Sequence, residues 1–135
     1  MIINPVIMVV DDDAMVRAII HEYLESFGYK NVIVMPDGEA ALKYLRVGSN
    51  HVDLIISDWE MPKLNGLGLL QAVRHNQSRK DVKFLMLTSQ RSQERFKITK
   101  AVRHHVDAYM VKPFQGEVFK LKVEQLLAEE KQESA

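Results

Sequence analysis

The chain has 135 residues, 47% of them hydrophobic and 27% charged, a composition typical of one soluble globular domain with a single core. Its 18 Lys and Arg residues balance its 18 Asp and Glu residues, which excludes the overall positive charge that drives non-specific nucleic-acid binding. The absence of cysteine excludes disulfides and thiol chemistry, and no apolar run approaches the roughly 18 residues of a membrane span, so we expect a cytoplasmic protein without membrane contact.

Five short apolar segments rich in β-branched residues alternate with segments of helical period, which predicts five strands and five helices. The expected strands cover residues 6–10, 32–34, 52–56, 84–87 and 108–111. The expected helices lie within residues 16–27, 36–48, 66–75, 94–105 and 116–130. The first helix is the clearest, because Val16, Ile19 and Ile20 open an i, i+3, i+4, i+7 apolar stripe. Gly28 is placed to end it.

Strict alternation of strands and helices predicts an α/β fold, with a doubly wound five-stranded parallel sheet and helices on both of its faces. Sheets of this type bind ligands at the carboxyl ends of their strands. Four of the five expected strands deliver polar or charged residues to that edge. These are Asp11 and Asp12 after the first strand, Ser57 and Asp58 after the third, Thr88 and Ser89 after the fourth, and Lys112 and Pro113 after the fifth.

The residues at this edge predict chemistry on a phosphoryl group. Carboxylates without a neighbouring Cys or His favour a hard cation, Mg²⁺ above all, for which Asp11 and Asp12 are the expected first ligands. A separate carboxylate, Asp58, can then act as a nucleophile toward phosphorus and form an acyl phosphate. Lys112 and Thr88 supply an ammonium group and a hydroxyl that stabilise the charge on the phosphoryl oxygens.

Four sequence segments carry these residues in order: IMVVDDDAMVR, DLIISDWEMPKLNGLGLL, FLMLTS and AYMVKPF. Together they resemble the receiver domains of two-component response regulators, and within that family the CheY-like single-domain type. The resemblance implies a flavodoxin-like fold with strand order 2-1-3-4-5 and Asp58 as the phosphoacceptor. It also implies Mg²⁺ held by Asp12, Asp58 and the backbone carbonyl of Glu60, with Asp11 acting through metal-bound water, and a cis peptide bond before Pro113.

The resemblance further implies a switch in which phosphorylation of Asp58 draws the Thr88 hydroxyl inward and Tyr109 turns into the vacated space. The surface that would change includes Arg91, Arg95, Tyr109, Phe114, Val118, Leu121, Lys122 and Gln125. The expected partners are a histidine kinase or phosphotransfer protein and a downstream protein target, for which the flagellar motor switch is one hypothesis. The basic run over residues 91–105 is expected to be a solvated face and does not predict nucleic-acid binding.

Two alternatives remain open. The first is a phosphatase of the haloacid dehalogenase type, because Asp11 and Asp13 form its Asp-x-Asp motif, although Ala14 and Met15 replace the usual Gly-Thr. Asp13 also suits the N-cap of the first helix. The second is the front domain of a longer protein. We expect a receiver domain over residues 1–130 with a polar tail over 131–135, acting alone as a signalling phosphoacceptor that phosphorylates and dephosphorylates itself with Mg²⁺ and is not an ordinary enzyme.

Two places depart from the family pattern. His105 and Val106 stand where a Gly-Ala pair commonly precedes the fifth strand, so the sequence leaves the shape of the preceding helix undetermined. Glu60 and Gln90 lie two positions after Asp58 and Thr88, where the family tunes hydrolysis of the acyl phosphate, so the sequence predicts no phosphoryl lifetime.

Overall fold

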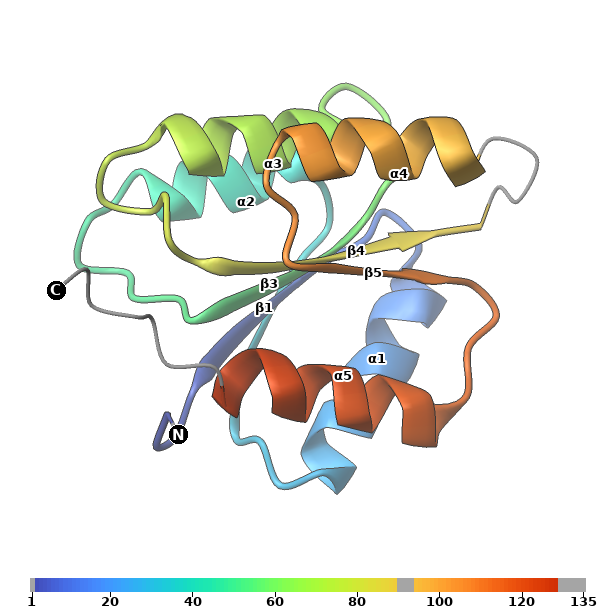
Figure 1. Cartoon of the computed structure of the whole chain (residues 1–135). Coiled ribbons are helices and arrows are strands. Elements are labelled where there is room, and N and C mark those ends of the chain that lie inside the picture. Colours follow the sequence, from blue (N-terminus) through green and yellow to red (C-terminus); the bar gives the residue numbers. More distant parts are fainter. Residues whose placement is uncertain (1, 90–93, 129–135) are drawn as a thin grey trace, which may run out of the picture.

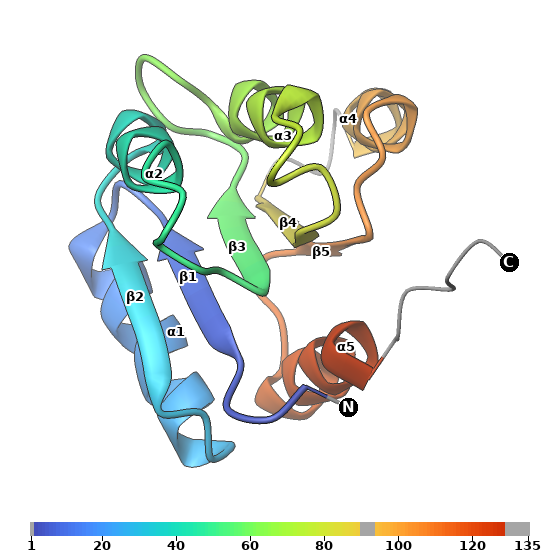
Figure 2. The same cartoon turned by 90° about the vertical axis from the view of Figure 1, so that its left-hand side faces the viewer.

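A computed structural model describes residues 2–89 and 94–128, without the side chains of residues 94–97. Five parallel strands form one twisted sheet in the order β2-β1-β3-β4-β5 (Figure 2). The strands are β1 Val6–Val10, β2 Asn31–Met35, β3 Leu54–Asp58, β4 Lys83–Thr88 and β5 Ala108–Val111. All four neighbouring pairs are parallel, so the predicted fold class and strand order are confirmed.

Five helices connect the strands and cover both faces of the sheet. They are α1 Ala14–Ser26, α2 Gly38–Leu45, α3 Gly66–His75, α4 Glu94–Arg103 and α5 Gly116–Ala128. Helices α1 and α5 lie on one face, and α2, α3 and α4 lie on the other (Figures 1 and 2). No helix in the described part of the chain combines the length and the apolar character needed to cross a membrane.

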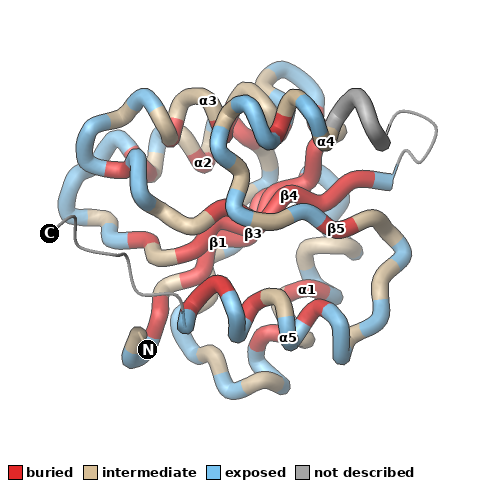
Figure 3. Tube along the Cα trace, viewed as in Figure 1, coloured by how far each residue is buried: buried red, intermediate tan, exposed pale blue. Residues whose placement is uncertain are grey.

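The core consists of two apolar layers, one on each face of the sheet. In β1, Ile7 and Val9 pack toward α1 and α5, whereas Met8 and Val10 pack toward α2 and α3. This alternation follows from the two-residue period of a strand, and it explains why strands covered on both faces have continuously apolar sequences. Figure 3 shows the buried residues concentrated along the central strands. Strand β3 is buried along its whole length.

The third strand lies two residues later than the predicted range of 52–56. Val52 is buried, yet the strand begins at Leu54. Asp53 precedes it and is fixed to β1, because its amide donates to the Val6 carbonyl oxygen and its carboxylate accepts from the Val6 amide at 2.8 Å. This side-chain bond joins Asp53 to the first residue of β1. The hydrogen-bonded part of β3 therefore begins after Asp53, and the apolar residue before it, Val52, does not belong to the strand.

Helix α1 has the predicted N-cap and terminating glycine, but it begins at Ala14, before the predicted range of 16–27, and does not bury its whole apolar stripe. The Asp13 carboxylate accepts from the amides of Met15 and Val16, so Asp13 is the N-cap as expected. At the other end Gly28 has φ +98°, a conformation that glycine adopts without strain. Ile19 was predicted to face the core and is 47% exposed, because α1 covers the edge of the sheet and its apolar arc is wider than the contact beneath it.

Candidate functional site

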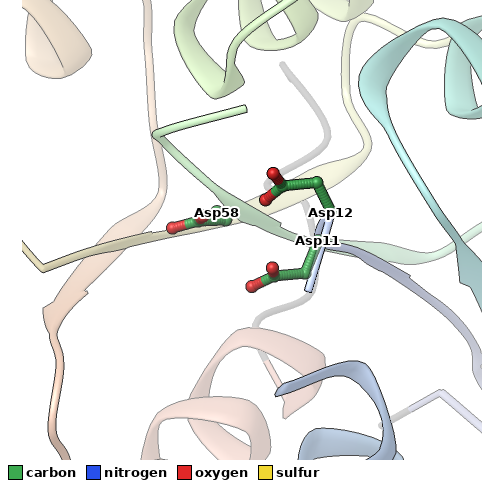
Figure 4. Close-up of side chains that lie close together, drawn as sticks. All are labelled: Asp11, Asp12 and Asp58. Atoms are coloured by element: carbon green, nitrogen blue, oxygen red, sulfur yellow. The ribbon is translucent and has the colours of Figure 1, made fainter. Parts of the chain in front are cut away.

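Three carboxylates meet at the carboxyl ends of two adjacent strands. Asp11 follows β1 and Asp58 ends β3, and these residues are only 1% and 6% exposed, whereas Asp12 is exposed. One oxygen of each group lies within 4.8 Å of the others, and Figure 4 shows the three carboxylates gathered around a common region. The sheet order creates this cluster, because β1 and β3 are neighbours although 46 residues separate Asp12 from Asp58.

Lys112 brings a positive charge to the same cluster from the end of β5. Its Nζ donates to Asp11 Oδ2 and to Asp58 Oδ1, both at 3.1 Å. The peptide bond between Lys112 and Pro113 is cis, as the family resemblance implied. One ammonium therefore bridges two buried carboxylates that would otherwise repel each other at close range.

The charges at this edge change the acidity of Asp58 and Lys112. Burial raises the pKa of Asp58 to about 6, the nearby Asp11 and Glu60 carboxylates act in the same direction, and Lys112 opposes them. For Lys112, burial by itself would lower the pKa, but Asp58 and Asp11 outweigh it and leave the pKa raised. Asp58 therefore loses its proton less readily than an ordinary aspartate does, whereas Lys112 keeps its charge more firmly than an ordinary lysine.

The backbone around Asp11 is fixed by two contacts. The Asp13 amide donates to Asp11 Oδ1 at 2.9 Å, and Arg17 Nη1 donates to the Asp11 carbonyl oxygen at 2.6 Å. Arg17 is a residue of this region that was not predicted from the sequence. The sequence does indicate this contact through the position of Arg17, four residues after the N-cap Asp13. A long side chain one turn into a helix points back toward the N-terminus and can reach the backbone that precedes the helix.

Thr88 and Glu60 are paired with each other in this structure. Thr88 ends β4 and is 2% exposed, and its Oγ1 donates to Glu60 Oε1 at 3.1 Å. From the family resemblance we expect Glu60 to act through its backbone carbonyl and Thr88 to act on phosphoryl oxygens. The side-chain bond between them was not predicted, because the loop after β3 decides where the Glu60 side chain points.

Gly66 is a second residue of this region that the sequence analysis did not single out. Its amide donates to the Trp59 carbonyl oxygen at 2.9 Å, which folds the loop after β3 back over the strand end. A Cβ at this position would overlap the Asp58 carbonyl oxygen and lie 2.7 Å from Met86 Sδ. Only glycine permits the start of α3 to approach the end of β3 this closely.

Tyr109 lies on β5, away from the carboxylate cluster, and is 39% exposed. It lines an open cavity of about 550 Å³ together with Val106, Phe114 and Val118. In the β4–β5 register Thr88 pairs with Val111, and Met86 pairs with Tyr109. Because residues two apart on a strand share a face, Thr88 and Tyr109 are diagonal neighbours on one face of the sheet.

Other members of the predicted interaction surface follow the same arrangement. Val118 and Leu121 of α5 are exposed, as expected, and so is Val102 of α4. Arg91 and the side chain of Arg95 lie outside the described residues, as do Gln90 and the expected tail over residues 131–135.

The donor set fits a hard divalent cation. Its atoms are carboxylate oxygens from Asp11, Asp12 and Asp58, the ligand type that Mg²⁺ prefers. These oxygens all lie within 4.8 Å of one another, and opposite ligands of an octahedral Mg²⁺ lie about 4.2 Å apart. The cluster is therefore an acidic site of suitable chemistry and size.

Comparison with known proteins identifies the class. The chain matches the response regulator receiver domain over residues 7–124, and it belongs to this family of signalling proteins. It is 36% identical over 120 residues to the chemotaxis protein CheY of Pseudomonas aeruginosa, covering 89% of this chain and 94% of the relative. It is 30% identical to the solved chemotaxis response regulator CheY4 of Vibrio cholerae, with a TM-score of 0.79 and coverage of 90% of this chain and 98% of that chain.

A more distant structure shares the fold. The receiver domain of a sensor histidine kinase from Pseudomonas aeruginosa is 21% identical, has a TM-score of 0.80 and covers 93% of this chain and 98% of that chain; it was solved with a magnesium ion coordinated in its active site cleft. The family match and the relatives do not support the phosphatase alternative. The geometry agrees, because Asp13 is engaged in capping α1.

Proposed function

We propose that this protein is a phosphorylation-dependent switch of a two-component system, in which Asp58 receives a phosphoryl group from a phosphohistidine of a kinase or phosphotransfer protein. The observation that carries the proposal is the pairing of buried Asp58 with Lys112 beside Asp11 at the switch-point edge of the sheet. The similarity to CheY proteins favours a chemotaxis-like pathway. A cytoplasmic location remains a prediction.

The proposed reaction uses the Asp58 carboxylate as the nucleophile. One of its oxygens attacks phosphorus, the P–N bond of phosphohistidine breaks, and the imidazole nitrogen leaves with the bonding electron pair. Lys112 Nζ already lies 3.1 Å from Asp58 Oδ1. It can therefore donate a hydrogen bond to an oxygen of the transferred phosphoryl group and stabilise the negative charge of that group. Water then attacks the acyl phosphate, the bond between phosphorus and the Asp58 oxygen breaks, and inorganic phosphate and the free Asp58 carboxylate result.

Asp11, Asp12 and Asp58, with the Glu60 carbonyl, would hold Mg²⁺. When bound, the cation supplies neutralisation of negative charge on the phosphoryl oxygens. The chain's own contribution is to place three carboxylates and one ammonium in a small, largely buried region before any phosphodonor arrives. Such preorganisation avoids the cost of gathering like charges during the reaction.

We propose that the output surface is the one formed by α4, β5 and α5. Tyr109, Val118 and Leu121 expose apolar side chains there, and a grouped apolar surface marks an interaction site. The β4–β5 register makes Thr88 and Tyr109 diagonal neighbours on one face of the sheet. The distance from the proposed phosphoryl site to this surface is therefore short. Movement of the Thr88 hydroxyl would open space that Tyr109 can enter, and a downstream protein would read the changed surface.

The test is to map the modified residue after treatment with acetyl phosphate and Mg²⁺. We expect one phosphoryl group on Asp58, sensitive to hydroxylamine as an acyl phosphate is, and lost in Asp58→Asn. Glu22→Gln, which neutralises an exposed carboxylate on α1, is the matched control and should be modified normally. Phosphate on Asp11, or unchanged labelling of Asp58→Asn, would refute the proposal.

A further inference from the structure

The contact between Thr88 and Glu60 has no role in the mechanism described above. Thr88 Oγ1 donates its proton to Glu60 Oε1 at 3.1 Å, and the other carboxylate oxygen, Oε2, is buried. The Glu60 carboxylate is therefore folded into the site instead of extending into solvent. Taking a charged group out of water is costly, so this orientation depends on what the carboxylate contacts there.

We infer that Glu60 is a positioning residue that holds the Thr88 hydroxyl away from the phosphoryl group's place and so stabilises the unphosphorylated form. This inference rests on the proposed function, with Asp58 as the phosphoacceptor. A threonine hydroxyl has one proton and can donate it to one acceptor at a time. Phosphorylation must therefore exchange the Thr88–Glu60 hydrogen bond for one between Thr88 and a phosphoryl oxygen.

A second effect of Glu60 acts in the same direction. The Glu60 carboxylate follows Asp58 by two residues, is partly buried and contacts Thr88 at the neighbouring strand end. A phosphoryl group on Asp58 adds negative charge close to this carboxylate and is repelled by it. The hydrogen bond and the charge thus both oppose phosphorylation, and they can be separated by substitution, because glutamine keeps the oxygen acceptor without the charge and alanine removes both.

The experiment measures the affinity for beryllofluoride, a non-covalent phosphoryl mimic, at saturating Mg²⁺, with Trp59 fluorescence as the signal. Trp59 follows Asp58 directly and is nearly buried, so it reports on this site. We expect Glu60→Ala to bind the mimic about tenfold more tightly than the wild type, as loss of a competing charge-assisted hydrogen bond requires. Glu60→Gln should lie between the two. Mg²⁺ affinity is measured separately for each variant.

A double-mutant cycle isolates the hydrogen bond from the charge. Glu60→Gln and Glu60→Ala both remove the charge, but only glutamine keeps an oxygen that can accept from Thr88. The difference between the beryllofluoride affinities of the two variants therefore contains the contribution of this hydrogen bond. We expect this difference to disappear in the Thr88→Ala background. A mere packing role for Glu60 would leave the difference in place, and that outcome would overturn the inference. So would equal or weaker affinity of Glu60→Ala at saturating Mg²⁺.

The experiment also distinguishes failure of the inference from failure of the proposed function. If the wild type gives no response to beryllofluoride, or if Asp58→Asn responds like the wild type, the proposed function itself is wrong. If the response requires Asp58 but Glu60→Gln and Glu60→Ala match the wild type, the proposed function stands and only the inference about Glu60 is wrong. Glu60→Gln is nearly isosteric, so at least one variant keeps the fold.

Discussion

Asp58 illustrates how a functional residue is maintained at a cost to stability. Its pKa is raised from the ordinary 3.8 to about 6, first by burial. The folded protein therefore holds this proton more tightly than the unfolded chain does. A group of this kind contributes stability at low pH and loses that contribution as the pH rises through about 6.

We therefore expect the metal-free protein to lose about 1 kcal/mol of unfolding free energy through Asp58 as the pH rises from 5 to 7. Asp58→Asn cannot titrate, so the variant should lack this loss and should be more stable than the wild type at pH 7. Urea unfolding of both proteins in EDTA at the two pH values measures the difference, since all other titrating groups are shared. An identical pH dependence in the two proteins would contradict the prediction.

Gly66 controls the position of Asp58 through the backbone. An alanine Cβ would overlap the Asp58 carbonyl oxygen and lie 2.9 Å from Trp59 Cα. Backbone atoms cannot move aside as a flexible side chain can, so we expect Gly66→Ala to lower the unfolding free energy by about 1–3 kcal/mol. It should also weaken the beryllofluoride response, because the end of β3 must shift.

Gly48→Ala is the matched control for Gly66→Ala. A Cβ at Gly48 has no heavy atom within 4 Å, so the same chemical change meets open space. Its unfolding midpoint in urea and its beryllofluoride response should stay close to those of the wild type. Equal effects of the two substitutions would show that close packing against Asp58 is not the cause.

Helices α1 and α4 end in the same way but with different residues at the key position. In α1 the Gly28 amide donates to the Glu25 carbonyl and the Tyr29 amide to the Leu24 carbonyl. In α4 the His105 amide donates to the Val102 carbonyl and the Val106 amide to the Ala101 carbonyl. Both are Schellman motifs, whose C′ residue has positive φ and is usually glycine.

His105 occupies that C′ position in α4 with φ 63°. A left-handed conformation costs a non-glycine residue about 1–2 kcal/mol, so we expect His105→Gly to raise the unfolding free energy by about 1 kcal/mol. The contact from Arg74 Nε is made to the His105 carbonyl oxygen and survives the substitution. The reciprocal change, Gly28→Ala in α1, should destabilise by a similar amount, and urea unfolding of both variants checks the pair.

The strands and the positions of the strand ends could be predicted from the sequence, whereas the conformations of loops and of one helix end could not. Alternating apolar segments and terminal polar residues sufficed to predict five strands and the gathering of Asp11, Asp12 and Asp58 at one edge, because a parallel sheet brings its strand ends together. The strand order was predicted from the resemblance to receiver domains. The orientation of Glu60 toward Thr88 depends on the conformation of a loop. The end of α4 at Arg103, two residues earlier than expected, depends on a left-handed residue that a histidine does not signal.

At the scale of the whole molecule, the sheet holds like charges together that the unfolded chain keeps apart. Among the described residues, Asp11 and Asp58 are buried at one edge and share the Lys112 ammonium, while Asp12 adds a third carboxylate to the cluster. These three carboxylates therefore come within 4.8 Å of one another only in the folded state. A divalent cation that relieves this charge binds the folded protein and not the unfolded chain, so binding must stabilise the fold.

We accordingly expect Mg²⁺ to raise the melting temperature and EDTA to lower it. Above the dissociation constant, each tenfold increase in Mg²⁺ adds about 1.4 kcal/mol, which corresponds to about 5 °C for a chain of this size. The response should be much smaller in Asp12→Ala, which removes an exposed ligand without creating a cavity, and unchanged in Glu22→Gln. Potassium chloride at matched ionic strength controls for screening. A melting temperature that responds equally to both salts would mean that the acidic cluster is not a specific cation site.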